Sequence, residues 1–248
     1  MSNIPDANKS LPVEAAHRFV EAHFPECYVA FVASSVLRGE GTATSDLDIV
    51  IISGREDAPF RQSFMWEGWP VEAFVHTETS YLDFFARASG RYEPSLEMMC
   101  AEGVVLRDRD GLAARIKAIA NRELEAGPEP LTQRGTDRLR YAITGLIDDF
   151  IGSERPEESF FIAHSLAEEC VKLVLLRSGR WLGKGKWVLR ALRRFDSAMA
   201  ERLSAALSLF CSTGRKDDLI AFADDALEPV GGRLFEGYYD SGKKLQSK

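Results

Sequence analysis

The chain contains the run Thr44-Ser45-Asp46-Leu47-Asp48-Ile49-Val50-Ile51-Ile52. Its β-branched residues are typical of a buried strand, and successive side chains of a strand point to opposite faces. We therefore expect Asp46 and Asp48 on the same face, at the head of the strand. Two like charges so close repel one another, and a cation between them relieves that cost. Because carboxylate oxygens are the ligands that Mg²⁺ prefers, the run predicts a magnesium site carrying a phosphate substrate.

Around this run, the first half of the chain alternates helical and strand-like patterns. In chain order we expect a helix over residues 13–24, strands over 27–33, 46–52 and 69–76, a helix near 82–86, a strand over 98–106 and a helix over 112–119. A loop is expected from Arg55 to Gly68. This alternation is typical of an α/β domain.

The second half of the chain shows helical periodicity almost throughout. It follows Gly127-Pro128-Glu129-Pro130, which predicts a helix stop and a stiff connector. Apolar stripes at helical spacing then recur over residues 139–150, 160–174, 188–195, 199–210 and 219–223. Amphipathic helices of this kind pack as a bundle. We therefore expect one domain over residues 1–126 and an all-helical domain over residues 127–248.

Two further features complete the predicted metal site. Glu72 lies within the apolar strand Val71-Glu72-Ala73-Phe74-Val75, where a carboxylate is costly to bury unless a metal or partner compensates it. It is the natural third ligand. Ahead of the acidic pair, the strand over 27–33 runs into Ser34-Ser35 and a small-residue turn that contains Gly39.

With this order of features, the sequence resembles the nucleotidyltransferase superfamily related to DNA polymerase β, especially the small bacterial antibiotic nucleotidyltransferases. Their motif has an apolar residue, Gly and Ser, a spacer of about ten residues, Asp-x-Asp, and a later acid in a strand. The resemblance implies an α+β fold, with an N-terminal mixed sheet flanked by helices and a C-terminal helical bundle. It covers roughly residues 27–76 at the level of motifs. One position departs from the family: Ser34 stands where the family has glycine, which eases close backbone approach.

The resemblance also implies roles for individual residues. Asp46, Asp48 and Glu72 would be the catalytic residues and hold Mg²⁺, with two ions expected and Glu72 also a candidate base. Ser35 would match the motif serine that contacts the β- and γ-phosphates of ATP or another nucleoside triphosphate. The residues assigned to nucleotide binding are Ser34, Ser35, Arg38, Thr44, Ser45, Lys184 and Lys186.

The reaction implied is transfer of a nucleoside monophosphate, AMP from ATP in the first instance, to a hydroxyl of a small molecule such as an aminoglycoside. The acids Asp148, Asp149, Glu168 and Glu169 of the helical half are further candidates for the base. Two alternatives stay open: a protein-modifying or antitoxin-type nucleotidyltransferase, and a non-catalytic nucleotide-binding regulator. A homodimer that shares sites between chains is also compatible with the resemblance.

The stretch over residues 177–194 is unusually basic and contains Trp181 and Trp187. Its cations suit a triphosphate, and its tryptophans suit stacking on a base or sugar. It lacks the glycine spacing of a P-loop. The competing interpretation is a glycine-rich turn between two helices, with tryptophans in the core and basic side chains in water.

The composition is that of an ordinary globular protein: 248 residues, 45% hydrophobic, with a net charge of -7. That charge makes nucleic acid an improbable partner. No apolar stretch is long enough to cross a bilayer and no secretion signal is evident, so we expect a cytoplasmic protein without a membrane partner. The four scattered cysteines, and His164 on an apolar stripe, are expected in the core.

Overall fold

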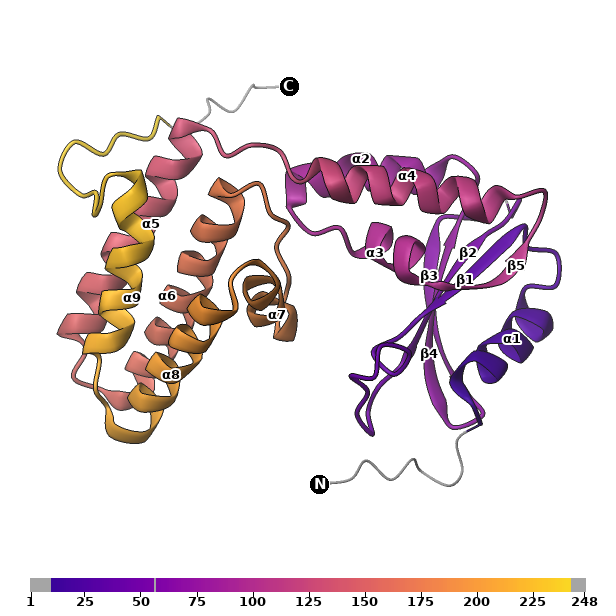
Figure 1. Ribbon diagram of the computed structural model, residues 1–248, viewed down its shortest axis with the longest axis horizontal. Coiled ribbons are helices and arrows are strands. Elements are labelled where there is room, and N and C mark those ends of the chain that lie inside the picture. The colour runs from indigo at the N-terminus through magenta and orange to yellow at the C-terminus, as the bar shows by residue number, and fades with distance from the viewer. Residues whose placement is uncertain (1–9, 56, 242–248) are drawn as a thin grey trace. The chain divides into compact units, whose positions relative to one another are not determined.

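The computed structural model describes residues 10–55 and 57–241 (Figure 1). The chain divides into two compact units, Met1–Gly127 and Pro128–Lys248. The first unit contains all the described strands, and the second contains only helices. The predicted α+β class, with a sheet followed by a helical bundle, is confirmed. None of the described helices is both long and apolar enough to cross a membrane.

The first unit is built on a five-stranded sheet with the order β3-β4-β2-β1-β5. The strands are β1 (Val29–Ala33), β2 (Leu47–Ile52), β3 (Phe60–Trp66), β4 (Trp69–His76) and β5 (Val104–Asp108). β2 and β4 are parallel, whereas every other neighbouring pair is antiparallel. The mixed sheet expected from the sequence is therefore present, with the central position occupied by the strand that follows Asp46.

The two faces of this sheet are covered by different helices (Figure 1). On one face, Val32, Ile49 and Ile51 belong to a core that includes α1 (Pro12–His23). On the other face, the core is completed by α2 (Ser80–Arg91), α3 (Ser95–Glu102) and α4 (Leu112–Ala126). Val50 and Ile52 belong to this second face, and Asp48 shares it because strand side chains alternate.

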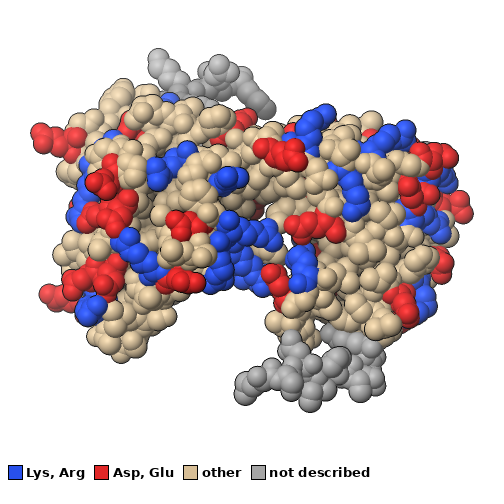
Figure 2. Space-filling view, viewed as in Figure 1, with Lys and Arg blue, Asp and Glu red and all other residues tan. Residues whose placement is uncertain are grey.

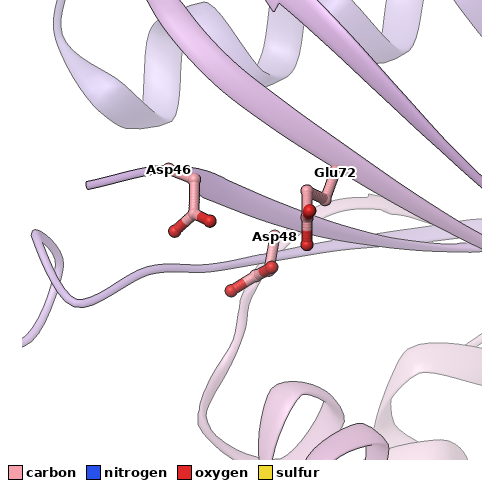
Figure 3. A group of neighbouring side chains, drawn as sticks. All are labelled: Asp46, Asp48 and Glu72. Atoms are coloured by element: carbon pink, nitrogen blue, oxygen red, sulfur yellow. The ribbon is translucent and has the colours of Figure 1, made fainter. Parts of the chain in front are cut away.

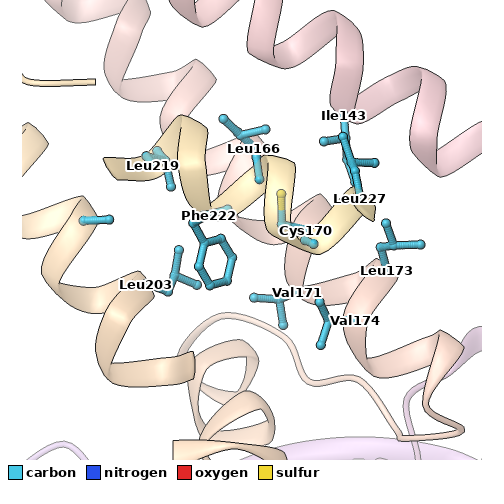
Figure 4. Packing of buried hydrophobic residues seen from close by; sticks show 14 of the residues in the cluster. Ile143, Leu166, Cys170, Val171, Leu173, Val174, Leu203, Leu219, Phe222 and Leu227 are labelled. Carbon is cyan, nitrogen blue, oxygen red and sulfur yellow. The ribbon is translucent and has the colours of Figure 1, made fainter. Parts of the chain in front are cut away.

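The second unit is a bundle around one apolar core (Figure 4). Its helices are α5 (Gln133–Gly152), α6 (Pro156–Arg177), α7 (Lys186–Phe195), α8 (Ser197–Thr213), α9 (Asp217–Leu227) and the 3₁₀ turn η1 (Glu228–Val230). α6 lies at the centre, and Leu166, Cys170 and Leu173 are completely buried on it. Thr132 caps α5 and Asp196 caps α8, each by accepting a hydrogen bond from a backbone amide of the first turn.

The predicted loop over residues 55–68 is wrong, because it contains the edge strand β3. Arg61, Gln62 and Ser63 are exposed there, so the strand lacks the alternating apolar pattern of a half-buried one. A tight connection to β4 was the missed signal. Trp66 pairs with Trp69 across Glu67-Gly68, and both turn residues have positive φ, as a two-residue hairpin requires.

The predicted strand over residues 98–106 is also wrong in its first half. Residues up to Glu102 belong to α3, and the strand β5 begins only at Val104. Between them Gly103 passes so close to α3 that a Cβ would meet the carbonyl oxygen of Met99 at 2.4 Å. A run of apolar residues does not distinguish a buried helix from a buried strand, which is why the boundary was missed.

Two residues expected in the core lie at the surface instead. The side chain of His164 is 71% exposed and lies 3.5 Å from the carboxylate of Glu168. Cys211 is exposed, whereas Cys27, Cys100 and Cys170 are buried as expected. His164 lies on α6 beside the apolar stripe rather than on it, and Cys211 lies on α8 just after the predicted stripe, having been expected in the core only as a scattered cysteine.

Candidate metal and active site

Three carboxylates converge at one end of the sheet (Figure 3). Asp48 of β2 is paired in register with Glu72 of the parallel strand β4, and Asp46 precedes β2 by one residue. One ligand oxygen from each of the three lies within 4.8 Å of the others, and all three residues are half-buried. Neighbouring parallel strands place paired side chains on the same face, so this convergence follows from the register.

The electrostatics of the cluster favour a bound cation. Burial, followed by the charges of Asp46 and Glu72, raises the pKa of Asp48 to about 7. Arg61 and Arg38 act in the opposite direction on the pKa of Asp48, but they do not cancel the rise. A divalent cation neutralises such a cluster, and carboxylate oxygens suit Mg²⁺ or Mn²⁺ rather than a soft metal. The donor set therefore fits the metal that the sequence predicts.

Arg61 is a component of this site that the sequence analysis missed. Its guanidinium group donates a hydrogen bond to Oε2 of Glu72 and forms an ion pair with it. The guanidinium carbon lies 4.8 Å from the ring centre of Phe74, and the side chain is 56% exposed. The residue is on β3, the strand mistaken for a loop. Recognition of the Glu67-Gly68 hairpin would have placed Ser63 opposite Glu72 and Arg61 opposite Phe74, but it would not have shown that the side chain of Arg61 reaches Glu72.

Ser34, the residue in the place of the family's glycine, has a structural role in the turn that precedes the acids. Its hydroxyl donates a hydrogen bond of 2.6 Å to the backbone oxygen of Asp46 and accepts one of 3.2 Å from the backbone amide of Val36. The side chain is buried. The hydroxyl therefore ties the end of β1 to the start of β2, directly beside the cluster.

The predicted phosphate-binding serine, Ser35, is also buried and occupied. Its hydroxyl lies 2.9 Å from that of Ser45, and Oγ of Ser45 accepts a hydrogen bond of 2.8 Å from the amide of Thr42. Thr44 is exposed at the tip of this turn. The turn is thus closed by its own side chains. A phosphate contact by Ser35 or Ser45 stays a prediction and requires these hydroxyls to exchange partners.

Arg38 is held near the acids by ion pairs with two other carboxylates. Its guanidinium nitrogens lie 3.3 Å from Glu102 and 3.9 Å from Glu40. Its charge contributes to lowering the pKa of Asp48, so Arg38 is within electrostatic reach of the cluster. This position is compatible with the predicted contact to a nucleotide, which stays a prediction.

The remaining predicted residues belong to the second unit. Lys184 lies in the loop before α7, Lys186 is the first residue of that helix, and both are exposed. The candidate bases there lie on α5 and α6. Asp148 is 3.8 Å from Arg233, and Glu169 is 3.3 Å from Lys172. The roles assigned to these residues stay predictions.

No family model matches this sequence, and no curated protein does. Among solved structures, the chain is similar to a nucleotidyltransferase-like protein from Exiguobacterium sibiricum. The two share 12% sequence identity with a TM-score of 0.45, and the match covers 88% of this chain and 73% of the other.

Proposed function

We propose that this protein transfers a nucleoside monophosphate, AMP from ATP, to a hydroxyl group of a small molecule in a Mg²⁺-dependent reaction. The observation that carries the proposal is the convergence of Asp46, Asp48 and Glu72, each with a ligand oxygen within 4.8 Å of the others. An oxygen-only cluster with excess negative charge is suited to a metal that accompanies a phosphate substrate. The small-residue turn that precedes the acids supports the same proposal.

In this reaction the acceptor oxygen bonds to the α-phosphorus of the nucleotide as the bond to pyrophosphate breaks. Asp46, Asp48 and Glu72 would hold the metal, and Ser34 keeps the turn beside Asp46 in place through its hydrogen bond of 2.6 Å. Bound Mg²⁺ supplies charge neutralisation for the triphosphate and for the departing pyrophosphate. Arg61 and Arg38 lie within electrostatic reach of Asp48 and supply positive charge near the acids.

A base must accept the proton of the acceptor hydroxyl, and it must lie within hydrogen-bond reach of that oxygen. Glu72 is the candidate in the first unit. Asp148, Asp149, Glu168 and Glu169 are the candidates of the helical unit. An acidic acceptor site would attract a polycationic molecule, and for that reason an aminoglycoside-like compound is the first acceptor to test.

The decisive experiment measures pyrophosphate release from Mg-ATP in the presence of a panel of hydroxyl-bearing acceptors, with labelled nucleotide to trace the product. We expect release that depends on one acceptor and on Mg²⁺, and its loss in Asp48→Asn. Asp83→Asn is the matched control, because Asp83 is exposed on α2 and the chemical change is identical. Full turnover in Asp48→Asn would refute the metal assignment.

The same assay separates the two alternatives. Labelled nucleotide that ends on a protein rather than on a small molecule identifies a protein-modifying or antitoxin-type enzyme. Mg²⁺-dependent nucleotide binding without pyrophosphate release, across ATP and the other nucleoside triphosphates, identifies a non-catalytic binding protein. Either result contradicts the proposal.

A further inference from the structure

The charge of this chain is strongly segregated. Residues 170–195 contain eight lysines and arginines and no aspartate or glutamate, so the remainder of the chain carries −15 against −7 for the whole. Most of these cations lie on α7 and on the loop that precedes it. We use the term basic α7 surface for five exposed residues, Arg180, Lys184, Lys186, Arg193 and Arg194. Figure 2 shows lysines and arginines gathered over α7.

The helical part of the basic α7 surface runs along one side of α7. Lys186, Arg193 and Arg194 follow the spacing i, i+7 and i+8, which places them on one helical face. From the first to the last of these residues the helix rises by roughly 12 Å. In the part of the chain that the structure describes, no salt bridge involves any residue of the basic α7 surface. Like charges collected in this way favour an anionic ligand.

The loop and the helix form one rigid platform. Gly183 approaches the backbone of Trp187 so closely that a Cβ would meet the carbonyl oxygen of Trp187 at 2.4 Å. The amide of Trp187 donates to the oxygen of Lys184, and the amide of Val188 donates to that of Gly185, both at 3.1 Å. These contacts hold Lys184 beside the first turn of α7, so the stripe is preorganised rather than assembled on binding.

An aromatic ring stands at the edge of the stripe. The guanidinium carbons of Arg190 and Arg194 lie 4.8 Å and 5.5 Å from the ring centre of Trp187, which is only partly buried. Arg194 is exposed and its planar guanidinium group suits a bidentate contact with phosphate, whereas Nη1 of Arg190 is buried. Cations that follow a backbone, next to an aromatic ring on which a base stacks, are the combination used by proteins that bind single-stranded nucleic acids.

A membrane is a poor alternative partner. Leu192 of α7 is completely buried, and Val188 and Leu189 pack against the core of the second unit. Phe195 at the end of the helix is the large apolar residue of α7 that is exposed, and one such side chain is far less than the apolar face that an amphipathic helix inserts into a membrane. A single triphosphate would occupy only part of the stripe, whose length matches on the order of three successive phosphates of a strand.

We propose that the basic α7 surface binds a single-stranded nucleic acid through its phosphate backbone, with a base against Trp187. This inference goes beyond the proposed nucleotidyl transfer and does not depend on it, because the surface lies entirely in the second unit. It also replaces the expectation, drawn from the net charge, that nucleic acid is an improbable partner. The net charge of the whole chain does not show how its charges are distributed, and this acidic chain carries a local basic surface.

The test is fluorescence anisotropy with the full chain and labelled 20-nucleotide RNA, DNA and duplex DNA, in EDTA and without nucleoside triphosphate. We expect a single strand to bind more tightly than the duplex. Comparison of the RNA and DNA strands identifies which nucleic acid the surface prefers. In the variant K184Q/K186Q/R193Q/R194Q, affinity at 50 mM KCl should fall by about tenfold or more, and the salt slope should decrease by about 3 for the four lost phosphate contacts.

The matched control is R202Q/R215Q, which neutralises two exposed arginines of the same unit that are paired with Asp225 and Asp218. It should bind as the unchanged protein does, whereas K184Q/K186Q and R193Q/R194Q, with the same loss of charge, should each weaken binding. A dissociation constant weaker than about 10⁻⁴ M for every single strand would overturn the proposal, because that is about the weakest affinity typical of non-specific binding. The proposal would also be overturned if R202Q/R215Q lost as much affinity as the test variant, or if the duplex bound more tightly than the single strand. The same holds if polyglutamate or phosphatidylserine vesicles displaced the labelled strand as well as an unlabelled strand does. Circular dichroism verifies that each variant is folded.

Discussion

Asp48 and Glu72 are paired in register on the parallel strands β2 and β4, so that their carboxylates face the same side of the sheet as that of Asp46 (Figure 3). Carboxylates on neighbouring parallel strands are separated by little more than the strand spacing, and their repulsion must be relieved by a proton or a cation. Burial and this repulsion together raise the pKa of Asp48 to about 7.

Neutralising Asp48 should stabilise the metal-free protein. The pKa of Asp48 rises from 3.8 to about 7 on folding, so the folded state binds the proton more tightly and loses stability as pH increases from about 4 through 7. At pH 8 in EDTA, Asp48→Asn should raise the free energy of unfolding by roughly 1 to 3 kcal/mol. Urea unfolding measures this. In contrast, added Mg²⁺ should stabilise the unchanged protein and not the variant, and equal stabilisation of both would contradict the site.

Arg61→Gln should strengthen metal binding. The guanidinium group of Arg61 occupies Oε2 of Glu72, an atom that a metal would need, so the arginine and the metal compete for it. We expect calorimetric titration with Mn²⁺ to show a severalfold tighter dissociation constant in Arg61→Gln. Arg55→Gln is the control, since Arg55 pairs with Asp57 outside the cluster. Weaker Mn²⁺ binding in Arg61→Gln would show that the arginine supports the ligands instead.

Ser34→Ala should destabilise the protein and loosen the turn beside Asp46. The change removes a hydroxyl that donates to the oxygen of Asp46 and accepts from the amide of Val36, both in a buried position. Loss of such contacts costs about 1 to 3 kcal/mol. Chemical denaturation measures the cost. Ser63→Ala on the exposed part of β3 is the control and should change stability by less than about 0.5 kcal/mol. A neutral Ser34→Ala would exclude the structural role of this hydroxyl.

Glu97 should make stability depend on pH from inside α3. The residue is 1% exposed, and its Oε1 has no hydrogen-bond partner among the described residues. Burial raises the pKa of Glu97 from 4.5 to about 7, so its contribution is fully present below about 4.5 and is lost as pH rises through 7. Glu97→Gln should therefore be more stable than the unchanged protein at pH 8, by roughly 1 to 3 kcal/mol, and nearly equal at pH 4.5.

Asp48 acts in the same direction as Glu97, so the two effects must be separated. The loss of stability between pH 5 and pH 8 should be smaller in Glu97→Gln and in Asp48→Asn than in the unchanged protein, and smallest in the double variant. Thermal unfolding of the four proteins across this pH range measures the four slopes. An unchanged slope in Glu97→Gln would show that the carboxyl is not buried in solution.

Many of the strands and helices of this protein can be predicted from local sequence patterns. The run from Asp46 to Ile52 identifies its own strand and places both aspartates on one face, because alternation is a local property of extended chain. The helical stripes after Pro130 predict the bundle for an equally local reason, the period of the α-helix. The helical second unit and the candidate metal ligands Asp46 and Asp48 followed from such patterns, whereas the α+β class was implied by the family resemblance.

Pairing between distant segments was decided only in three dimensions. Nothing local shows that β4 lies parallel to β2 with Glu72 opposite Asp48, or that Arg61 reaches Glu72 from an edge strand whose exposed residues carry no alternation. The hydrogen-bond partners of the Ser34, Ser35 and Ser45 hydroxyls likewise depend on how the turn folds back on itself. Alternation and helical period arise within a few residues, whereas register and contact depend on which segments bury their apolar faces against one another.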